Sequence, residues 1–247
     1  MPKKPIWWKK QNLRWLKLCW NGNAEFESQE NVEQLLESLE PHPNIKGLVI
    51  HHYKGSRFPL WMRESNLRNV VEIELNDCEN CSQLPPFGKL PLLKRLVICR
   101  MDKVRYIDDD FPGDGPVRGF PSLEVLHIHS LPNLKGLSRE EGRELLPRLR
   151  EMSIGDCPNF RFPCLLSLIK LEIHRFTKLG VFPRALTRLV ALKSLHIHEC
   201  PKLESLPEEG LQGLESLQFL EILDCEKLSS LSEGLRYLTA LENLYIN

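Results

Sequence analysis

The chain has 247 residues, with 33 basic and 33 acidic side chains and a formal net charge of zero. Such a balance gives no electrostatic footprint for nucleic acid or an anionic membrane, so we expect neither as a partner. The apolar fraction of 42% excludes wholesale disorder. The longest apolar runs are a few residues, too short for a transmembrane helix.

The first forty residues are segregated by charge. Residues 1–20 carry six basic side chains and no acid, whereas residues 21–40 carry six glutamates and no base. One interpretation is two solvated faces that attract each other weakly. The alternative is a basic docking patch at one end of the molecule, formed by Lys9, Lys10, Arg14 and Lys17.

Eight cysteines occur in a chain whose opening, MPKKPIWWKK, has too short an apolar stretch for a secretory leader. Disulfide frameworks are typical of short secreted chains. The sequence therefore favours reduced cysteines and a cytoplasmic or nuclear setting.

A nine-residue pattern, L-x-x-L-x-I-x-x-C, recurs from one end of the chain to the other. The third anchor is Ile in eight copies and Leu in two, and successive copies start 19 to 32 residues apart. This period is typical of leucine-rich repeats, in which each unit supplies one short strand and a return loop. The ten copies begin at Leu13, Ile45, Val70, Leu93, Leu123, Leu149, Leu168, Leu192, Leu217 and Leu241.

The alternation within each copy predicts which side chains are buried. In the copy LKSLHIHEC, Leu195 and Ile197 point inward, whereas His196 and His198 point outward, because successive strand residues face opposite sides. One unit cannot bury its apolar side alone, so the units must stack in parallel. We therefore expect Leu195 to lie between Leu171 and Leu220.

These features predict an α/β leucine-rich-repeat solenoid: a single domain over 1–247, curved like a horseshoe, with about ten parallel strands on its concave side. Pro- and Gly-rich segments such as LPEEG and QLPPFG favour an irregular convex side. Between the first two copies, Val32, Leu35, Leu36 and Leu39 fall on one helical face. The sequence predicts a short helix over 29–40, on the convex side.

Three side chains of one copy, His196, His198 and Cys200, resemble a zinc ligand set. Cys200 occupies the inward corner of the repeat, as Cys78 does, whereas both histidines face the opposite surface. We therefore expect no zinc site from these three residues. Cys78 and Cys81 form a C-x-x-C, but both are repeat anchors, so a redox motif is not expected.

Histidines recur in two outward columns. His51, His129, His174 and His198 share one column, and His127 and His196 share the next. Ordinary exposed polar residues are the commoner explanation for such a row. A pH-sensitive or metal-binding cluster is the alternative, because His174 and His198 lie on adjacent predicted strands.

No catalytic motif is present. The chain has no G-x-x-x-x-G-K-[ST], H-E-x-x-H or G-x-S-x-G. We expect no enzyme activity, no cofactor, no metal and no small-molecule substrate.

With catalytic motifs absent, the remaining candidate site is the outward face of the sheet, which suits protein recognition. Its side chains are mixed in charge and size, with aromatic residues toward the C-terminal copies. The candidate surface comprises Glu72, Glu74, Arg95, His127, His129, Lys170, Glu172, His174, His196, His198, Phe219, Glu221 and Tyr245.

Several segments resemble a known family. LRWLKLCWNG, the Glu-rich helix and LEPHPNIKGLVIHHYKGSRFPLWM look like the opening leucine-rich repeats of plant coiled-coil, nucleotide-binding disease resistance proteins. LHIHECPKLESLPEEG is similar in the same way. The resemblance covers nearly the whole chain.

The resemblance implies a protein partner, either a pathogen effector or a host protein that the receptor monitors, and a role in restraining a nucleotide switch. In that family the basic first copies often dock on the nucleotide-binding module, and Lys9, Lys10, Arg14 and Lys17 occupy the matching end. The chain contains no coiled-coil or nucleotide-binding segment, so nucleotide binding does not carry over. Because the sequence stops within a repeat, at Tyr245-Ile246-Asn247, we expect a fragment or a truncated product.

A second function class is a leucine-rich adaptor of the ubiquitin-ligase type. It predicts an F-box-like helical segment, which MPKKPIWWKKQNLRW does not supply. Extracellular receptor repeats predict a leader and L-x-G-x-I-P units, and neither is present.

Overall fold

A computed structural model describes residues 10–20, 28–63, 67–108, 119–139, 145–163, 165–180, 186, 188–206, 208–231 and 233–247. The chain divides into two compact units. The first is Met1–Leu123 with Leu137–Leu146, and the second is Glu124–Gly136 with Pro147–Asn247. Each unit is built on its own run of parallel strands.

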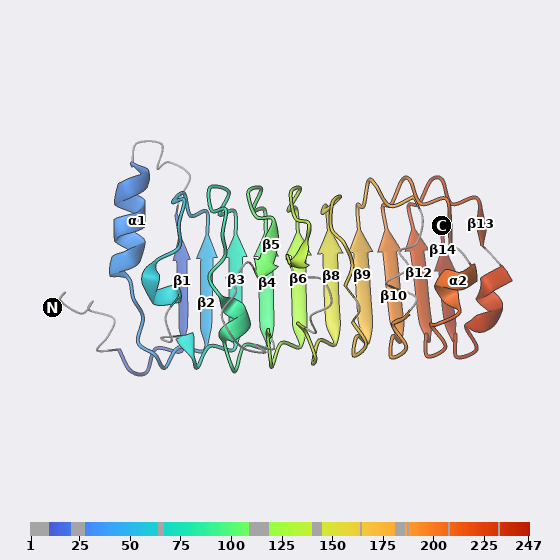
Figure 1. The fold of residues 1–247 in the computed structure, drawn as a ribbon, viewed down its shortest axis with the longest axis horizontal. Helices are drawn as coiled ribbons and strands as arrows, with labels where there is room; N and C mark the ends of the chain where they lie inside the picture. The colour runs from blue at the N-terminus through green and yellow to red at the C-terminus, as the bar shows by residue number, and fades with distance from the viewer. Residues whose placement is uncertain are drawn as a thin grey trace. The chain divides into compact units, whose positions relative to one another are not determined.

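The first unit contains four strands of the repeat, and in Figure 1 their arrows stand side by side and point the same way. They are β1 (Trp15–Cys19), β2 (Gly47–His51), β3 (Glu72–Asn76) and β4 (Arg95–Cys99), paired in chain order. Helix α1 (Gln29–Ser38) and two 3₁₀ turns, η3 (Leu60–Met62) and η5 (Phe87–Lys89), belong to the connections. Two short strands, β5 (Tyr106–Asp108) and β7 (Gly136–Ser138), form a separate two-stranded sheet.

The second unit contains six strands of the repeat, again parallel and in chain order. They are β6 (Val125–His129), β8 (Glu151–Gly155), β9 (Lys170–His174), β10 (Ser194–His198), β12 (Phe219–Leu223) and β14 (Asn243–Ile246). In the return segments, β11 (Ser205–Leu206) pairs with β13 (Ser230–Leu231). A short helix, α2 (Glu208–Leu211), and a 3₁₀ turn, η7 (Glu233–Tyr237), complete the unit.

The register of the strands confirms the predicted apolar spine. Leu195 of β10 lies opposite Leu171 of β9 on one side and Leu220 of β12 on the other, and all three are 0% exposed. In β9, β10 and β12, buried residues alternate with half-buried ones, as a strand with one covered face requires. The stacked aliphatic side chains supply the core, and backbone hydrogen bonds between repeats satisfy the strands.

Helix α1 was predicted over 29–40 and spans Gln29–Ser38. The Ser28 side chain caps it by accepting a hydrogen bond from the Asn31 amide at 3.3 Å. Val32 and Leu36 are buried, but Leu35 was predicted on the same face and is exposed. The helix docks on the segment after β2, where the Trp61 indole nitrogen donates to the Leu36 carbonyl at 3.1 Å.

In the eight repeats from β2 to β12, the corner after the strand is closed by a buried side chain, which in four copies is Cys78, Cys157, Cys200 or Cys225. Directly before this corner residue, the backbone takes the left-handed conformation, with φ between 50° and 57°. These left-handed residues are His52, Asp77, Arg100, Ser130, Asp156, Arg175, Glu199 and Asp224, and we call them the left-handed column.

The repeats and their parallel strands confirm the predicted α/β leucine-rich-repeat solenoid. The expectation of a single domain over 1–247 stays a prediction. Within the described part of the chain, no helix combines the length and the apolarity that a bilayer crossing requires.

Candidate protein-recognition surface

The residues predicted for the recognition surface all lie on the uncovered face of the strands. Each five-residue strand of the repeat presents three outward positions, and the register aligns these positions into three columns. The thirteen predicted side chains occupy these columns and are half-buried or exposed.

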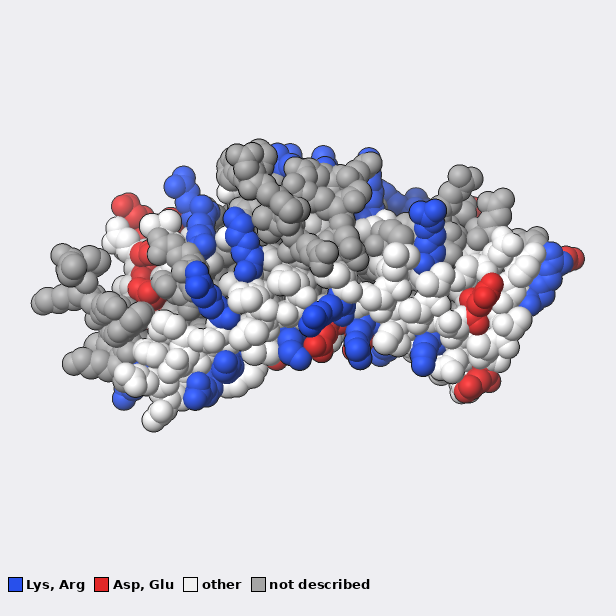
Figure 2. Space-filling model, turned by 60° about the horizontal axis from the view of Figure 1, so that its bottom comes forward, with Lys and Arg blue, Asp and Glu red and all other residues white. Residues whose placement is uncertain are grey.

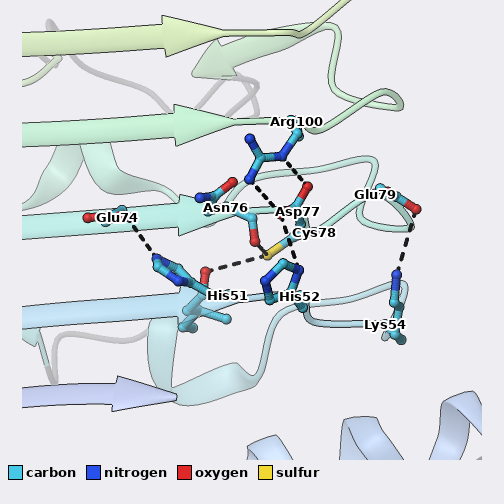
Figure 3. Close-up of polar contacts among 10 residues, drawn as sticks. His51, His52, Lys54, Glu74, Asn76, Asp77, Cys78, Glu79 and Arg100 are labelled. Atoms are coloured by element: carbon cyan, nitrogen blue, oxygen red, sulfur yellow. Dashed lines mark hydrogen bonds and ion pairs between the residues drawn. The ribbon is translucent and has the colours of Figure 1, made fainter. Parts of the chain in front are cut away.

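In the first unit, the outward side chains pair with one another across neighbouring strands. The His51 Nε2 atom lies 2.8 Å from Glu74 Oε1, and the Arg95 Nε atom lies 3.3 Å from Glu72 Oε1. Figure 3 shows the ring of His51 turned toward the Glu74 carboxylate. These pairs fix the orientation of all four side chains on this face.

A second polar group lies at the end of these strands, in the left-handed column, and was not predicted. Asp77 is only 8% exposed, and both its oxygens accept hydrogen bonds from the Arg100 guanidinium, one of them at 2.7 Å (Figure 3). His52 Nδ1 lies 3.1 Å from the same carboxylate. The Arg100 hydrogen bonds hold the pKa of Asp77 below its ordinary value.

The left-handed column is also charged in the second unit. Arg175 Nε lies 3.5 Å from Asp156 Oδ2 and 3.9 Å from Glu199 Oε2, and the Ser130 hydroxyl donates to Asp156 at 3.3 Å. The sequence signal for this column was present, since a charged residue precedes the corner cysteine in NDC, GDC, HEC and LDC. Hydrophobic periodicity does not show it.

Histidines form a row across the second unit. The ring centroids of His129 and His174 are 6.0 Å apart, and those of His174 and His198 are 5.1 Å apart. Gly155 separates the first pair in register, and an added Cβ there would lie 2.9 Å from the His129 ring, so the small residue lets the rings approach. Burial, and then the neighbouring histidine, lower the pKa of both His129 and His174.

Beside this row lies Glu172, which contacts His174 from the same strand. Its Oε1 accepts from Lys170 at 2.6 Å, and its Oε2 lies 3.7 Å from His174 Nε2. Burial, the largest single effect, would raise the pKa of Glu172, but the hydrogen bond and charge of Lys170, together with Ser153 and His174, outweigh it, and the pKa falls to about 2. Glu172 is therefore an anion at every physiological pH.

The structure separates the suspected zinc ligands and brings in a new one. Cys200 is buried at the corner, as predicted, while His196 and His198 lie on the uncovered face. From the next strand, Glu221 Oε2 lies 2.7 Å from His196 Nδ1 and 3.0 Å from His198 Nε2. The three ligand atoms lie within 4.8 Å of one another.

Aromatic rings continue the face past the histidines. Phe219 lies 4.9 Å from the His196 ring and 5.4 Å from Tyr245, centroid to centroid, in tilted arrangements. Tyr245 is 51% exposed. Exposed aromatic rings held by neighbours are common anchors of protein interfaces, because little entropy is lost when they bind.

The predicted basic patch is partly described. Lys9 lies outside the described residues, whereas Lys10, Arg14 and Lys17 are exposed. Arg14 Nη1 donates to the Asn44 carbonyl at 3.2 Å, and Lys17 occupies the middle outward position of β1. These positions leave the three cationic groups at the surface of the first unit.

More basic side chains follow the edge at which the strands begin, which Figure 2 turns toward the viewer. The residue directly before the strand is basic at Arg14, Lys46 and Lys94 in the first unit and at Arg150 and Lys193 in the second. Sequence reasoning found the patch at the start of the chain but missed this recurrence. It could have been found by aligning the ten copies on their first outward residue.

The C-x-x-C of Cys78 and Cys81 is structural. Both thiols are buried, and burial raises the pKa of Cys78 to about 12. The Cys81 thiol donates to the Gly55 carbonyl at 3.3 Å. A thiol that does not ionise is not a redox nucleophile, which agrees with the interpretation of both cysteines as repeat anchors.

Residues 4–101 match a family model described as R13L1/DRL21 leucine-rich repeats. The chain is 40% identical over 207 residues to the disease resistance protein RGA2 of Solanum bulbocastanum, covering 80% of this chain and 21% of that protein. It is 33% identical over 263 residues to a disease resistance RPP13-like protein 1 of Arabidopsis thaliana, covering 96% of this chain and 24% of that protein.

Among solved structures, the leucine-rich repeat domain of the type III effector XopL has a TM-score of 0.66 at 18% identity. The match covers 82% of this chain and 69% of that chain, and it shows the fold alone. The chain spans about a fifth of the length of the RGA proteins it matches. The strands, the family match and these relatives together show that the chain belongs to the leucine-rich repeats of plant disease resistance proteins.

Proposed function

We propose that the chain is the protein-recognition and autoinhibitory module of an intracellular plant immune receptor that acts in defence against pathogens. The observation that carries the proposal is the uncovered face of the parallel strands. Each strand holds its outward side chains at fixed spacing, and they are polar, charged and aromatic in turn. Such a face suits a macromolecular partner and binding rather than catalysis.

The recognition part of the proposal rests on the second unit. His196, Phe219 and Tyr245 form a continuous set of rings, and Tyr245 is the most accessible of them. Glu172 and Glu221 place negative charge beside the rings. A pathogen effector or a monitored host protein with apolar and basic side chains would complement this surface.

The autoinhibitory part rests on the basic end of the first unit. Lys10, Arg14 and Lys17 are exposed, and charge at a rim chiefly sets association rate and orientation. An acidic surface on the nucleotide-binding part of the receptor is the proposed partner for this end. The module would work in the cytoplasm or nucleus, without a cofactor.

A chimera tests this proposal. The repeats of RGA2 are replaced by this chain, and the chimera is expressed in leaves without a pathogen. We expect the unaltered chimera to stay silent and the double variant Arg14→Glu, Lys17→Glu to cause cell death, because charge reversal releases the docked module. The matched control, Lys202→Glu with Lys227→Glu, reverses two exposed lysines of the second unit and should stay silent. Equal behaviour of the two double variants would contradict the autoinhibitory role.

A further inference from the structure

We propose that His196, His198 and Glu221 form a binding site for a divalent transition-metal ion such as Zn²⁺. The three side chains lie on the uncovered face of the second unit, two from β10 and one from β12. Their ligand atoms are two imidazole nitrogens and one carboxylate oxygen. Imidazole and carboxylate groups are ligands that zinc accepts, and three protein ligands leave a fourth position for water.

The distances suit an ion of that size. Glu221 Oε2 lies 2.7 Å from His196 Nδ1 and 3.0 Å from His198 Nε2. Around a tetrahedral zinc ion with bonds of about 2.0–2.1 Å, ligand atoms are about 3.3 Å apart. The carboxylate oxygen therefore has to move away from each imidazole by a few tenths of an ångström, which rotation of the side chains can supply.

The backbone holds the ligands in place before an ion binds. His196 and His198 are separated by one residue, so both point to the same side of β10. His196 lies directly opposite Glu221 in the register of β10 and β12. All three side chains are largely buried between their neighbours, which limits the rotamer freedom that binding would have to remove.

His196 already has a hydrogen-bond partner that would hold its ring in place when a metal binds. The Ser194 hydroxyl lies 2.8 Å from His196 Nε2, the ring nitrogen that faces away from the site. When Nδ1 binds a metal, Nε2 carries the proton, and the Nε2–H group can donate a hydrogen bond to the serine oxygen. Metal-bound histidines regularly have such a partner, which fixes their tautomer and orientation. The Phe219 ring, 4.9 Å away, supports the imidazole further.

The charge of the site also favours a cation. The Glu221 side chain carries a negative charge at neutral pH, as glutamates ordinarily do. Glu172, opposite His196 on the other side, adds a second negative charge nearby. Cys200 is not a member of the site, since it is buried at the corner below the sheet.

Titration of the purified chain with Zn²⁺ by calorimetry tests the proposal. We expect His198→Gln and Glu221→Gln to weaken binding at least about tenfold, and Ser194→Ala by about tenfold to a hundredfold. The matched control is His174→Gln, because His174 occupies the same column one strand away and offers no ligand to the site. The control should change the affinity less than about twofold.

Cobalt binding distinguishes this site from the cysteines. Co²⁺ bound by two histidines and a carboxylate should give a visible spectrum without the intense near-ultraviolet thiolate band, and circular dichroism should show that each metal-free variant is folded. Equal Zn²⁺ affinity in the unaltered chain, His198→Gln and Glu221→Gln would overturn the assignment. A thiolate band for Co²⁺ that persists in both variants would overturn it as well.

The proposal can also be tested by building a second metal site in the first unit. His51 and Glu74 occupy the positions of His198 and Glu221, and Val49 occupies that of His196. Val49→His should therefore complete the same ligand set and raise the Zn²⁺ stoichiometry by one equivalent. An unchanged stoichiometry in folded Val49→His would overturn the claim that this ligand set is sufficient.

Discussion

The outward faces of the two units differ in how their side chains are used. In the first unit, charged groups pair with an opposite charge on the next strand, as His51 does with Glu74 and Arg95 with Glu72. In the second, histidines face histidines, and Phe219 and Tyr245 extend the row. The same backbone thus carries one face on which ion pairs dominate and one on which histidine and aromatic rings lie against one another.

The buried apolar spine should contribute equally to the stability of both units. Its disruption should cause the largest loss in the free energy of unfolding. Leu195→Ala in β10 and Ile73→Ala in β3 remove fully buried side chains, and each should lower the free energy of unfolding by about 2–5 kcal/mol. Urea denaturation measures this. Leu166→Ala, at a leucine that is 59% exposed, is the matched control and should cost less than about 0.5 kcal/mol. A difference of several kcal/mol between Ile73→Ala and Leu195→Ala would show that the units do not share one kind of core.

Substitution of Asp77, which pairs with Arg100 in the first unit, should cause the next largest loss of stability. Asp77→Asn removes a buried carboxylate with two hydrogen bonds to Arg100, and we expect a loss of about 1–2 kcal/mol at pH 7. Because the folded pKa of Asp77 is lowered, its contribution is present above the ordinary value of about 3.9 and is lost as the pH falls through the folded pKa. The difference between the two proteins should therefore shrink below about pH 4.

Denaturation of Asp77→Asn and of the unaltered chain, measured from pH 7 down to pH 3, checks this linkage. Glu79→Ala is the control, since Glu79 forms an exposed pair with Lys54 at 3.8 Å and should contribute less than about 0.5 kcal/mol. A difference between Asp77→Asn and the unaltered chain that does not depend on pH would argue against the carboxylate as its source.

The histidine row should give the smallest loss of stability, in a pH window higher than that of Asp77. Burial lowers the pKa of His174, so the unfolded chain takes up a proton first as the pH falls. Stability should be lost as the pH drops from above about 6.5 through the folded pKa. His174→Asn should reduce this loss, as measured by the urea midpoint at pH 7.5 and pH 5. An equal loss of stability on acidification in His174→Asn and in the unaltered chain would contradict a contribution of His174 to this pH dependence.

Three features could be predicted: which repeat residues are buried, to which side of the strand each residue points, and how outward residues align across strands. All three follow from two-residue alternation within a recurring unit. Leu171, Leu195 and Leu220 stack where the pattern placed them. The exposure of Leu35 was missed, since a helical face read from spacing is wider than the part its neighbours cover.

The Asp77–Arg100 pair was missed because the left-handed turn that aims these side chains leaves no hydrophobic signal. Glu221 was predicted on the surface, but not its contact with His196 and His198. Alternation gives the side of a strand to which a residue points, whereas the reach of its side chain toward the next strand depends on rotamers.

The left-handed column has a consequence for how such a protein can diversify. A positive φ costs a non-glycine residue about 1–2 kcal/mol, because its Cβ crowds the backbone, and this cause does not depend on the sign of the side-chain charge. His52, Asp77, Arg100 and Glu199 occupy equivalent places with nearly the same backbone. The rim of the sheet can therefore exchange acid for base one repeat at a time, giving new electrostatic patterns on an unchanged scaffold.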